Sequence, residues 1–412
     1  MNTLSNKKRI AVVGTGHRGS GTWGQEIQHE LDEMVDIVGL CDTNPMRLDV
    51  VAGKLAGTPR ATTDYDQLLR EAQPHTVVVC TRDDTHADII VEALERGCDV
   101  ITEKPMCTTA EDCRRILDAE ARTGRKVNVA FNYRFAPTSR KIREIIASGR
   151  LGKITSVDFH WYLDTKHGAD YFRRWHAYRR HSGSLFVHKA THHFDLLNWW
   201  LDSDPRQINA QGKLAKYGAA GPYRGERCKT CPHKHDCFFF LDLEKDPYLT
   251  ELYEAPSQCD GYYRDGCVFR EDIDIWDTMT AEIEYENDVI VSYSLNAFMP
   301  IEGFHLAVNG TEGRMEIRMY ERQAFDAPHG KDEIVILGID RSVERIIVEH
   351  GDGGHFGGDP LLHRSLFDPE IEDAMGQRAG ARAGAMSVLT GVAAAHSVDL
   401  GRPVAIKPLL DE

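Results

Sequence analysis

A glycine-rich run near the start of the chain has the spacing of a phosphate-binding loop. The run Gly14-Thr15-Gly16-His17-Arg18-Gly19 follows the strand-like segment 9–13, and Asp42 ends the next apolar segment, 23 residues beyond Gly19. Glycines at this spacing permit a tight turn, close approach of the backbone to a pyrophosphate, and close packing of the following helix. Because Asp42 can bind ribose hydroxyls and repels a 2′-phosphate, the pattern predicts NAD as cofactor. The alternatives are a plain turn between strand and helix, and a solvated acid at position 42.

Histidines and a lysine gather in a second run. His188-Lys189-Ala190-Thr191-His192-His193 holds three imidazoles and one amine within six residues. Imidazole exchanges protons near neutral pH, so these side chains are candidates for acid–base catalysis. A lone histidine is more often a structural residue of the core, but so dense a group is difficult to bury without a function.

An arginine-rich run lies just before these histidines, in a chain whose formal net charge is −15. Its candidate substrate-binding residues are Arg173, Arg174, Trp175, His176, Arg179 and Arg180. Arginine binds carboxylate, sulfonate or phosphate through two parallel hydrogen bonds, and an interleaved tryptophan offers a stacking face for a sugar ring. The run therefore predicts an anionic sugar or glycoside as substrate. A solvated basic loop or a subunit interface is the alternative.

Five cysteines gather between residues 228 and 267, whereas the other five are scattered among apolar residues of the first 113. A tight pair of thiolates followed by two more is typical of a tetrahedral site, which predicts one structural zinc ion. The expected ligands are Cys228, Cys231, Cys237 and Cys267. Cys259 is the spare candidate, and His233 or His235 is a substitute for one thiolate. An iron–sulfur cluster and free buried thiols are the alternatives.

Two kinds of segment must position these groups. Residues 8–130 alternate runs rich in valine and isoleucine with amphipathic helical stretches, which predicts an α/β Rossmann domain over 1–130 with a doubly wound parallel sheet. Longer runs of alternating apolar and polar residues follow, which predict an α+β domain over 131–412 with a large, mainly antiparallel open sheet. Residues 212–272 are irregular and indicate an insertion. A last helix is expected at 379–400, closed by Gly401.

Four short motifs make the chain similar to the Gfo/Idh/MocA family of sugar and cyclitol oxidoreductases. They are Thr81-Arg82-Asp83-Asp84-Thr85-His86, where the family commonly has T-P-N-x-x-H, then Thr102-Glu103-Lys104-Pro105, Asn132-Tyr133-Arg134-Phe135 and Gly401-Arg402-Pro403-Val404. The tripeptide E-K-P alone is a weak signal. Its place in this order after a glycine-rich loop is specific, and the resemblance covers nearly the whole chain.

The resemblance implies roles for individual residues. In the family the lysine of E-K-P lies beside the nicotinamide and hydrogen-bonds the reacting hydroxyl, which assigns that role to Lys104. His192 matches the family's histidine, whereas His188 stands where the family has aspartate, and Lys189 adds a cation. The expected cofactor contacts of these motifs are Thr81, Arg82, His86, Glu103 and Asn132. The further substrate contacts are Tyr133, Arg134 and His193.

These implications favour an NAD-dependent carbohydrate oxidoreductase that transfers hydride between a carbon bearing a ring hydroxyl and nicotinamide. The departure at His188 and the basic run also suit an alternative, a redox-neutral NAD-dependent glycoside hydrolase. Its steps would be oxidation, elimination, hydration and reduction of an anionic glycoside such as a sulfoquinovoside or uronide. A cofactor-binding sensor without turnover would not need Lys104 and the histidines together.

Length and composition bound the remaining possibilities. At 412 residues the chain suits two domains, and 42% hydrophobic residues supply a sizeable core. The net charge of −15 argues against a nucleic-acid partner, and no apolar run reaches the roughly 18 residues that a membrane helix needs. We expect a cytoplasmic protein. The family resemblance implies a homo-oligomer, a dimer or a tetramer, formed through the open sheet.

Overall fold

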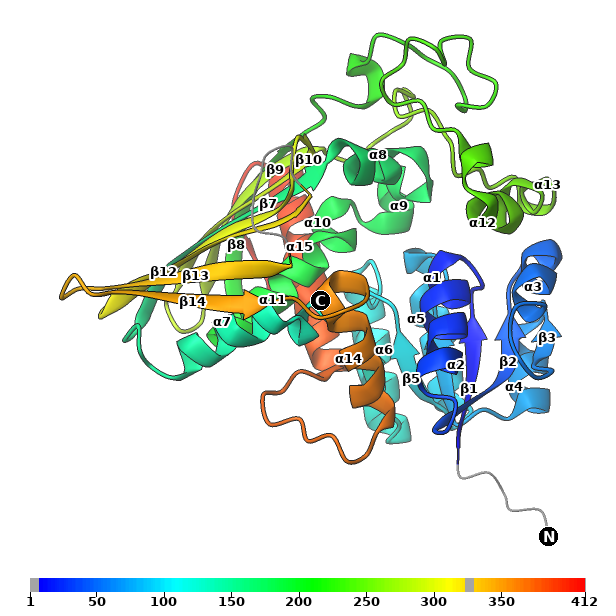
Figure 1. Ribbon diagram of the computed structural model, residues 1–412, viewed down its shortest axis with the longest axis horizontal. Coiled ribbons are helices and arrows are strands. Elements are labelled where there is room, and N and C mark those ends of the chain that lie inside the picture. Colours follow the sequence, from blue (N-terminus) through cyan, green and yellow to red (C-terminus); the bar gives the residue numbers. More distant parts are fainter. Residues whose placement is uncertain (1–6, 323–329, 412) are drawn as a thin grey trace.

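The computed structural model describes residues 7–322 and 330–411, which form two sheets and the helices that cover them (Figure 1). The N-terminal sheet consists of β1 (Lys8–Val13), β2 (Val35–Cys41), β3 (Arg60–Thr62), β4 (Thr76–Val79), β5 (Asp99–Thr102), β6 (Val127–Val129) and β15 (Ala379–Gly380). Its order is β15-β6-β5-β4-β1-β2-β3, and the first six strands in the chain run parallel. This order is that of a doubly wound nucleotide-binding sheet. The predicted Rossmann topology is confirmed.

Helices follow these strands as the periodicity predicts. They are α1 (His17–Ser20), the π-helical stretch η1 (Gly21–Glu26), α2 (Ile27–Glu30), α3 (Pro45–Ala52), α4 (Tyr65–Ala72), α5 (His86–Glu95) and α6 (Ala110–Thr123). Three of them begin at a polar residue whose side chain accepts a hydrogen bond from a backbone N–H of the first turn, namely Asn44, Asp64 and Thr109. The first helical stretch starts at His17, within the glycine-rich run.

The C-terminal sheet has nine strands. They are β7 (Ile154–Asp164), β8 (Pro205–Lys213), β9 (Thr278–Tyr285), β10 (Ile290–Met299), β11 (Glu302–Gly310), β12 (Gly313–Arg322), β13 (Lys331–Gly338), β14 (Val343–Glu349) and β16 (Val404–Ala405). Their order is β14-β13-β12-β11-β7-β10-β9-β8-β16, and every neighbouring pair is antiparallel except β7 with β10. The predicted mainly antiparallel sheet is confirmed.

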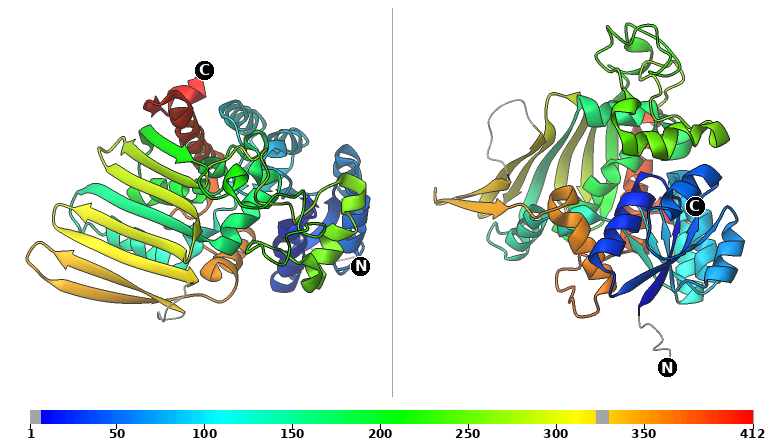
Figure 2. Two further views of the ribbon diagram at one scale, coloured as in Figure 1. Left: turned by 90° about the horizontal axis from the view of Figure 1, so that it is seen from above. Right: turned by 45° about the vertical axis from the view of Figure 1, so that its right-hand side comes forward.

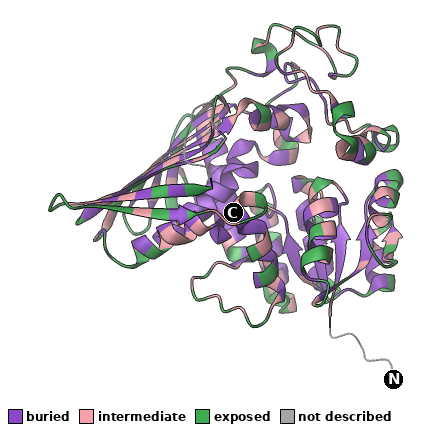
Figure 3. Ribbon diagram, in the orientation of Figure 1, coloured by how far each residue is buried: buried purple, intermediate pink, exposed green. Residues whose placement is uncertain are grey.

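Helices cover one face of this sheet, and alternate residues of β7 are buried beneath them. The covering helices are α7 (Pro137–Ala147), α8 (Thr165–Arg173), α10 (Leu185–His188), α11 (Ala190–Leu201) and α15 (Ala381–Leu400). Figure 3 shows α15 buried along most of its length, because it packs on β8 and α11 and also on α6 of the other sheet. Its sequence is apolar nearly all round, as a helix between two layers requires. α15 therefore joins the two halves of the molecule.

The predicted insertion crosses from one half to the other. It contains α12 (Pro247–Leu249), the π-helical stretch η7 (Thr250–Glu254) and α13 (Ser257–Asp260), which lie over the N-terminal sheet and beside α3 (Figures 1 and 2). Leu252 and Tyr253 are buried in the same apolar cluster as Ile10 and Trp23. Hydrophobic burial therefore fixes this part of the insertion to the N-terminal domain. Among the described residues, no helix is long and apolar enough to cross a bilayer.

Candidate active site

The glycine-rich loop connects β1 to α1, as the sequence predicts. Gly14 has a φ of +90°, and a Cβ there would lie 2.6 Å from the carbonyl carbon of Cys80. A Cβ on Gly19 would clash with the carbonyl oxygen of Gly14. These two positions therefore need glycine, the first for its left-handed backbone and the second for close packing of helix against strand.

Asp42 lies at the end of β2, beside this loop. Its carboxylate accepts hydrogen bonds from the backbone N–H and the hydroxyl of Thr15, at 2.8 and 2.9 Å, and from the N–H of Asn44 at 2.8 Å. Arg47 contacts the same carboxylate at 3.3 Å. The acid is thus fixed next to the loop, and its binding of ribose hydroxyls stays a prediction.

Lys104 follows β5 at the carboxyl edge of the parallel sheet, where ligands of such folds bind. Its Nζ donates a hydrogen bond to the carbonyl oxygen of His188 at 3.3 Å, so it faces the histidine-rich run of the C-terminal domain. Burial lowers the pKa of Lys104 to about 8; Asp83 opposes this shift and Lys189 adds to it. The amine therefore loses its proton around pH 8, which allows it to act as a proton acceptor for a hydroxyl.

Asp83 is a site residue that sequence analysis did not select. Its Oδ2 lies 2.5 Å from Nδ1 of His188, and both side chains are buried. Burial raises the pKa of Asp83 and lowers that of His188, so the pair holds one proton between the two atoms. A carboxylate of the N-terminal domain thus lies beside His188, the residue that stands where the family has aspartate.

His192 and His193 lie in an aromatic wall behind Lys104. The ring of His192 is 4.7 Å from that of Tyr133, and its Nδ1 has no hydrogen-bond partner in the described part of the chain. Burial, reinforced by the charges of Lys104 and Lys189, keeps the pKa of His192 well below its usual value, so the imidazole is neutral. His193 is fully buried and its Nδ1 bonds the hydroxyl of Tyr293 at 2.7 Å, while its Nε2 has no partner among the described residues, so its contact with substrate stays a prediction.

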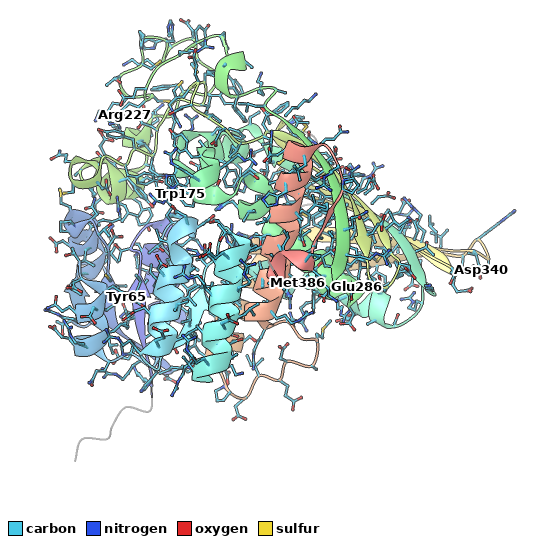
Figure 4. All side chains as sticks on the ribbon, turned by 180° about the vertical axis from the view of Figure 1, so that it is seen from behind. Tyr65, Trp175, Arg227, Glu286, Asp340 and Met386 are labelled. Carbon is cyan, nitrogen blue, oxygen red and sulfur yellow. The ribbon has the colours of Figure 1, made fainter. Side chains whose placement is uncertain are left out.

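A second group of rings borders His188 from α8 and the turn that follows. Trp175 stacks on His176 at 3.6 Å, and the ring of His176 is 4.3 Å from that of His188. Figure 4 shows Trp175 where this part of the C-terminal domain approaches the N-terminal domain. Nδ1 of His176 is buried without a partner among the described residues, so this wall offers both a stacking face and an unused polar atom.

The glycine-rich segment 351–359 brings a further histidine that sequence analysis missed. His355 and Phe356 have φ angles of 51° and 60°, an uncommon conformation for residues other than glycine, and one concentrated at functional sites. Nδ1 of His355 is 2.7 Å from Oδ2 of Asp359, and the imidazole lies 5.3 Å from the ring of Tyr133. The available signal was a histidine and an aspartate four residues apart among five glycines.

Several predicted cofactor contacts have hydrogen-bond partners within the protein, and their contact with the cofactor stays a prediction. Glu103 accepts hydrogen bonds from Arg18 and from the Trp23 indole, both at 2.7 Å, and Arg18 also bonds Asp359 at 3.2 Å.

His86 lies between the carbonyl oxygens of Pro105 and Thr81, at 2.9 and 3.2 Å. Arg82 is exposed and pairs with Asp84. Asn132 donates to Asp359 at 2.8 Å while its buried Oδ1 stays unpaired within the described residues, which suits a ligand donor.

The structure separates the predicted substrate-binding arginines. Arg134 forms a buried two-bond ion pair with Asp195, at 2.7 and 2.6 Å. Arg173 donates to Cys228 Sγ at 3.3 Å and to two carbonyl groups of the insertion. Arg179 pairs with Asp399 over the ring of Trp276, and Arg180 covers the ring of Tyr178 near the surface.

Arg174 alone among these arginines stays near the histidines. It pairs with Asp170, and after burial its charge is the largest influence that lowers the pKa of His176. The expected basic cluster does not gather as one group, because carbonyls of the insertion bind Arg173, Asp399 binds Arg179, and Arg180 lies over the Tyr178 ring. Arg174 remains the candidate for an anionic substrate.

The four predicted zinc ligands line one small cavity, together with Arg173 and several phenylalanines. Within residues 7–322 and 330–411, however, no three His, Cys, Asp or Glu side chains are placed so that they could share a metal ion. Cys228 instead accepts a hydrogen bond from Arg173, and Cys267 accepts one from the N–H of Phe269 at 3.4 Å. The geometry thus gives the zinc expectation no support.

The chain matches known proteins over nearly its whole length. Residues 8–131 match the NAD-binding Rossmann-fold domain of the Gfo/Idh/MocA oxidoreductase family, and residues 143–406 match its C-terminal alpha/beta domain. YteT of Bacillus subtilis (strain 168), named as an oxidoreductase, is 39% identical over 425 residues, 98% of each chain. An inositol 2-dehydrogenase of Rhizobium meliloti (strain 1021) is 30% identical over 218 residues, 52% of this chain and 62% of its own length.

The WlbA dehydrogenase of Bordetella pertussis, solved with NADH and UDP-GlcNAcA, shares the fold with a TM-score of 0.66 at 18% identity, over 97% of this chain and 98% of that one. The resemblance seen in the sequence motifs is confirmed: the chain belongs to the Gfo/Idh/MocA family of oxidoreductases.

Proposed function

We propose that the protein is an NAD-dependent carbohydrate dehydrogenase that oxidises a ring hydroxyl of an anionic sugar. The observation that carries this proposal is the meeting of Lys104, at the carboxyl edge of the Rossmann sheet, with the carbonyl of His188 in the C-terminal domain. This contact places a low-pKa amine between the cofactor domain and a group of neutral imidazoles. The relative named as an inositol dehydrogenase supports a polyhydroxylated substrate.

The proposed reaction divides between the cofactor and the protein. Bound NAD would accept the hydride from the carbon that bears the hydroxyl. The amine of Lys104 accepts the hydroxyl proton. Neutral His192 offers its unpaired Nδ1 to a further polar group of the substrate, and His188, held by Asp83, helps to orient the sugar. Water is limited here because Asp83, His188 and His192 are each less than a tenth exposed.

The anionic character of the substrate rests on Arg174. Arg174 and Arg264 both contact the carboxylate of Asp170, so two positive charges share one negative charge beside the histidines. A carboxylated or sulfonated sugar would complement the additional positive charge.

A redox-neutral NAD-dependent glycoside hydrolase is the second candidate. The observation that favours it is the second acid–base pair, Asp83 with His188, because elimination of an aglycone and addition of water need a further proton donor and acceptor. In that reaction the ketone formed first is reduced again by the same cofactor, so NADH does not accumulate.

One experiment separates the candidates. Protein as isolated is denatured and the released NAD is quantified; native protein is then incubated with free uronic acids, neutral sugars and their aryl glycosides. Growth of NADH absorbance with free anionic sugars is the expected result. Aglycone release without NADH accumulation would instead establish the hydrolase, and neither signal with any member of the panel would overturn both candidates.

We also propose that two or more copies associate through the uncovered face of the C-terminal sheet. Tyr162, His305 and Tyr320 of β7, β11 and β12 form a half-exposed row of rings on the face away from the helices. Aromatic residues are enriched in protein interfaces. Light scattering after size-exclusion chromatography tests this association, and a mass equal to one chain would contradict it.

A further inference from the structure

The part of the insertion formed by residues 247–264, here called the cap, reaches the cofactor loop itself. The backbone N–H of His17, inside the glycine-rich loop, donates a hydrogen bond to the hydroxyl of Tyr253 at 2.7 Å. In Rossmann domains the N–H groups at this helix start are the ones that bind the pyrophosphate. A tyrosine of the cap thus occupies the hydrogen-bonding position where a phosphate oxygen is expected.

Gly16 is what permits this approach. A Cβ on Gly16 would lie 3.2 Å from the Tyr253 hydroxyl oxygen, tighter than an ordinary contact. The second glycine of the motif is the one that ordinarily lets the backbone approach the pyrophosphate. Here the Tyr253 hydroxyl lies in the space that the missing side chain of Gly16 leaves open. A bound pyrophosphate would therefore lie directly beside this hydroxyl.

The cap is anchored next to the adenosine side of the loop by several buried hydrogen bonds. Asn44 donates to the carbonyl of Pro256 at 2.7 Å and to Asp260 at 2.8 Å. Arg47 bridges Asp260 at 2.8 Å and Asp42 at 3.3 Å. The residue that is expected to bind the ribose is therefore tied, through one arginine, to the cap.

Arg264 adds positive charge at the same place. Its guanidinium carbon lies 4.9 Å above the Tyr253 ring, and it shares Asp170 with Arg174. Partial burial and then the charges of Arg264, Arg18 and Arg174 lower the pKa of His17 to about 4. Arg18 pairs with two carboxylates, those of Glu103 and Asp359. Arg174 and Arg264, in contrast, share the one carboxylate of Asp170. The loop therefore faces an excess of positive charge, as a pyrophosphate requires.

We propose that Tyr253 and Arg264 of the cap belong to the dinucleotide site and bind the pyrophosphate of the cofactor from the side opposite the glycine-rich loop. When the cofactor binds, the N–H of His17 donates to a phosphate oxygen, and the Tyr253 hydroxyl turns its own O–H toward the phosphate. Burial raises the pKa of Tyr253, so this hydroxyl keeps the proton that it donates. Because the cofactor would be enclosed between the loop and the cap, we expect it to dissociate slowly into solution.

The test measures dissociation of NADH without substrate, by displacement with excess NAD in a stopped-flow fluorimeter. In Tyr253→Phe and Arg264→Gln we expect the dissociation rate to rise by about tenfold or more, because each variant removes a hydrogen bond to a charged phosphate. Affinity for ADP should fall in parallel, while affinity for adenosine stays unchanged, since adenosine lacks the phosphates.

Two variants of the same insertion are matched controls. Tyr263 lies beneath Arg227 at 4.1 Å and Arg224 pairs with exposed Glu271, both away from the loop, so Tyr263→Phe and Arg224→Gln should leave the rate unchanged. Thermal unfolding midpoints verify that all variants are folded. Unchanged or slower dissociation in Tyr253→Phe and Arg264→Gln would overturn the proposal, and slower dissociation would show that the cap obstructs the site. The inference depends on dinucleotide binding and not on the proposed reaction, so the two fail separately.

Discussion

Nδ1 of His188 lies 2.5 Å from Oδ2 of Asp83, although the two residues are 105 positions apart and belong to different halves of the molecule. Both side chains are buried, and burial favours the neutral form of each by raising the pKa of Asp83 and lowering that of His188. The shared proton therefore links the turn after β4 to the histidine-rich run. Lys104 contacts the same run, because its amine donates a hydrogen bond to the carbonyl of His188. The pair aligns the two domains at the site of chemistry.

Replacing Asp83 by asparagine removes the carboxylate while keeping the size of the side chain. We expect kcat to fall by about 10- to 1,000-fold, because the imidazole of His188 loses the group that fixes its orientation and proton. Steady-state kinetics with the best substrate of the panel measures this. Asp84→Asn is the control, since Asp84 pairs with Arg82 and His181 nearer the surface. Equal losses in both variants would contradict a specific role for Asp83.

The pKa of Lys104, lowered to about 8, sets the expected pH dependence. Below this value the amine is protonated and cannot accept the hydroxyl proton, so the rate of oxidation should rise with pH and level off above about 8. Lys104→Arg keeps a charge that does not titrate in this range, and should lower kcat by at least about 100-fold and abolish the rise. The control variant is Lys166→Arg, at an exposed lysine, and NADH binding is measured for both variants. A pH profile that stays unchanged in Lys104→Arg would refute the assignment.

Two arginines from the same run should differ in their effect on anionic substrates. Arg174→Leu removes the positive charge nearest His176 and should raise KM for anionic sugars by about tenfold or more, with a smaller effect on neutral sugars. Arg180→Leu should change neither, because Arg180 covers Tyr178 at the surface. Equal effects of Arg174→Leu on both classes of substrate would show that the site does not select for charge.

The Arg134–Asp195 pair is expected to support folding and not substrate binding. Arg134→Leu leaves the Asp195 carboxylate buried and unpaired, which should lower the free energy of unfolding by about 3 to 5 kcal/mol. The double variant Arg134→Met/Asp195→Leu should recover most of this loss, because no charge stays buried. Urea denaturation measures both values. A raised KM in Arg134→Leu without loss of stability would restore the substrate-binding role.

Metal analysis tests the expectation of zinc at the cysteine-lined cavity. Its described geometry offers no set of three ligands, so zinc in protein purified without added metal would require the thiols to move toward the ion. Exposed Cys259 should react first with a thiol reagent. One zinc per chain that disappears in Cys228→Ser and persists in Cys259→Ser would instead mean that the thiols draw together around the ion.

Most of the fold could be predicted because its signals are local. The buried strands β1, β2 and β4 are rich in valine and isoleucine, and the glycine spacing before α1 has few other uses. β3 and β8 cannot be recognised in this way, because R-A-T and P-R-Q-I-N-A-Q-G-K carry little apolar pattern. Such strands form because their neighbours offer free edges, which no local pattern records.

The site was less predictable because its decisive contacts join distant segments. Lys104, His188 and His192 were found from residue type and family motif, but nothing near Asp83 indicates that it meets His188. Likewise, Arg173 and Arg174 are neighbours in sequence, yet α8 ends between them, so one enters the insertion and the other stays with the histidines. Direction of a side chain at a helix end depends on tertiary packing.

The pairing of β15 with β6 has a consequence for synthesis in the cell. All the parallel strands of the first sheet lie within residues 8–129, but the strand that covers the β6 edge begins only at residue 379, 250 residues later. At roughly 5 to 20 residues per second, translation leaves that edge open for about 12 to 50 s. An uncovered edge is a template for unwanted pairing between chains, so the nascent N-terminal domain depends during this interval on chaperones or on the speed of the ribosome.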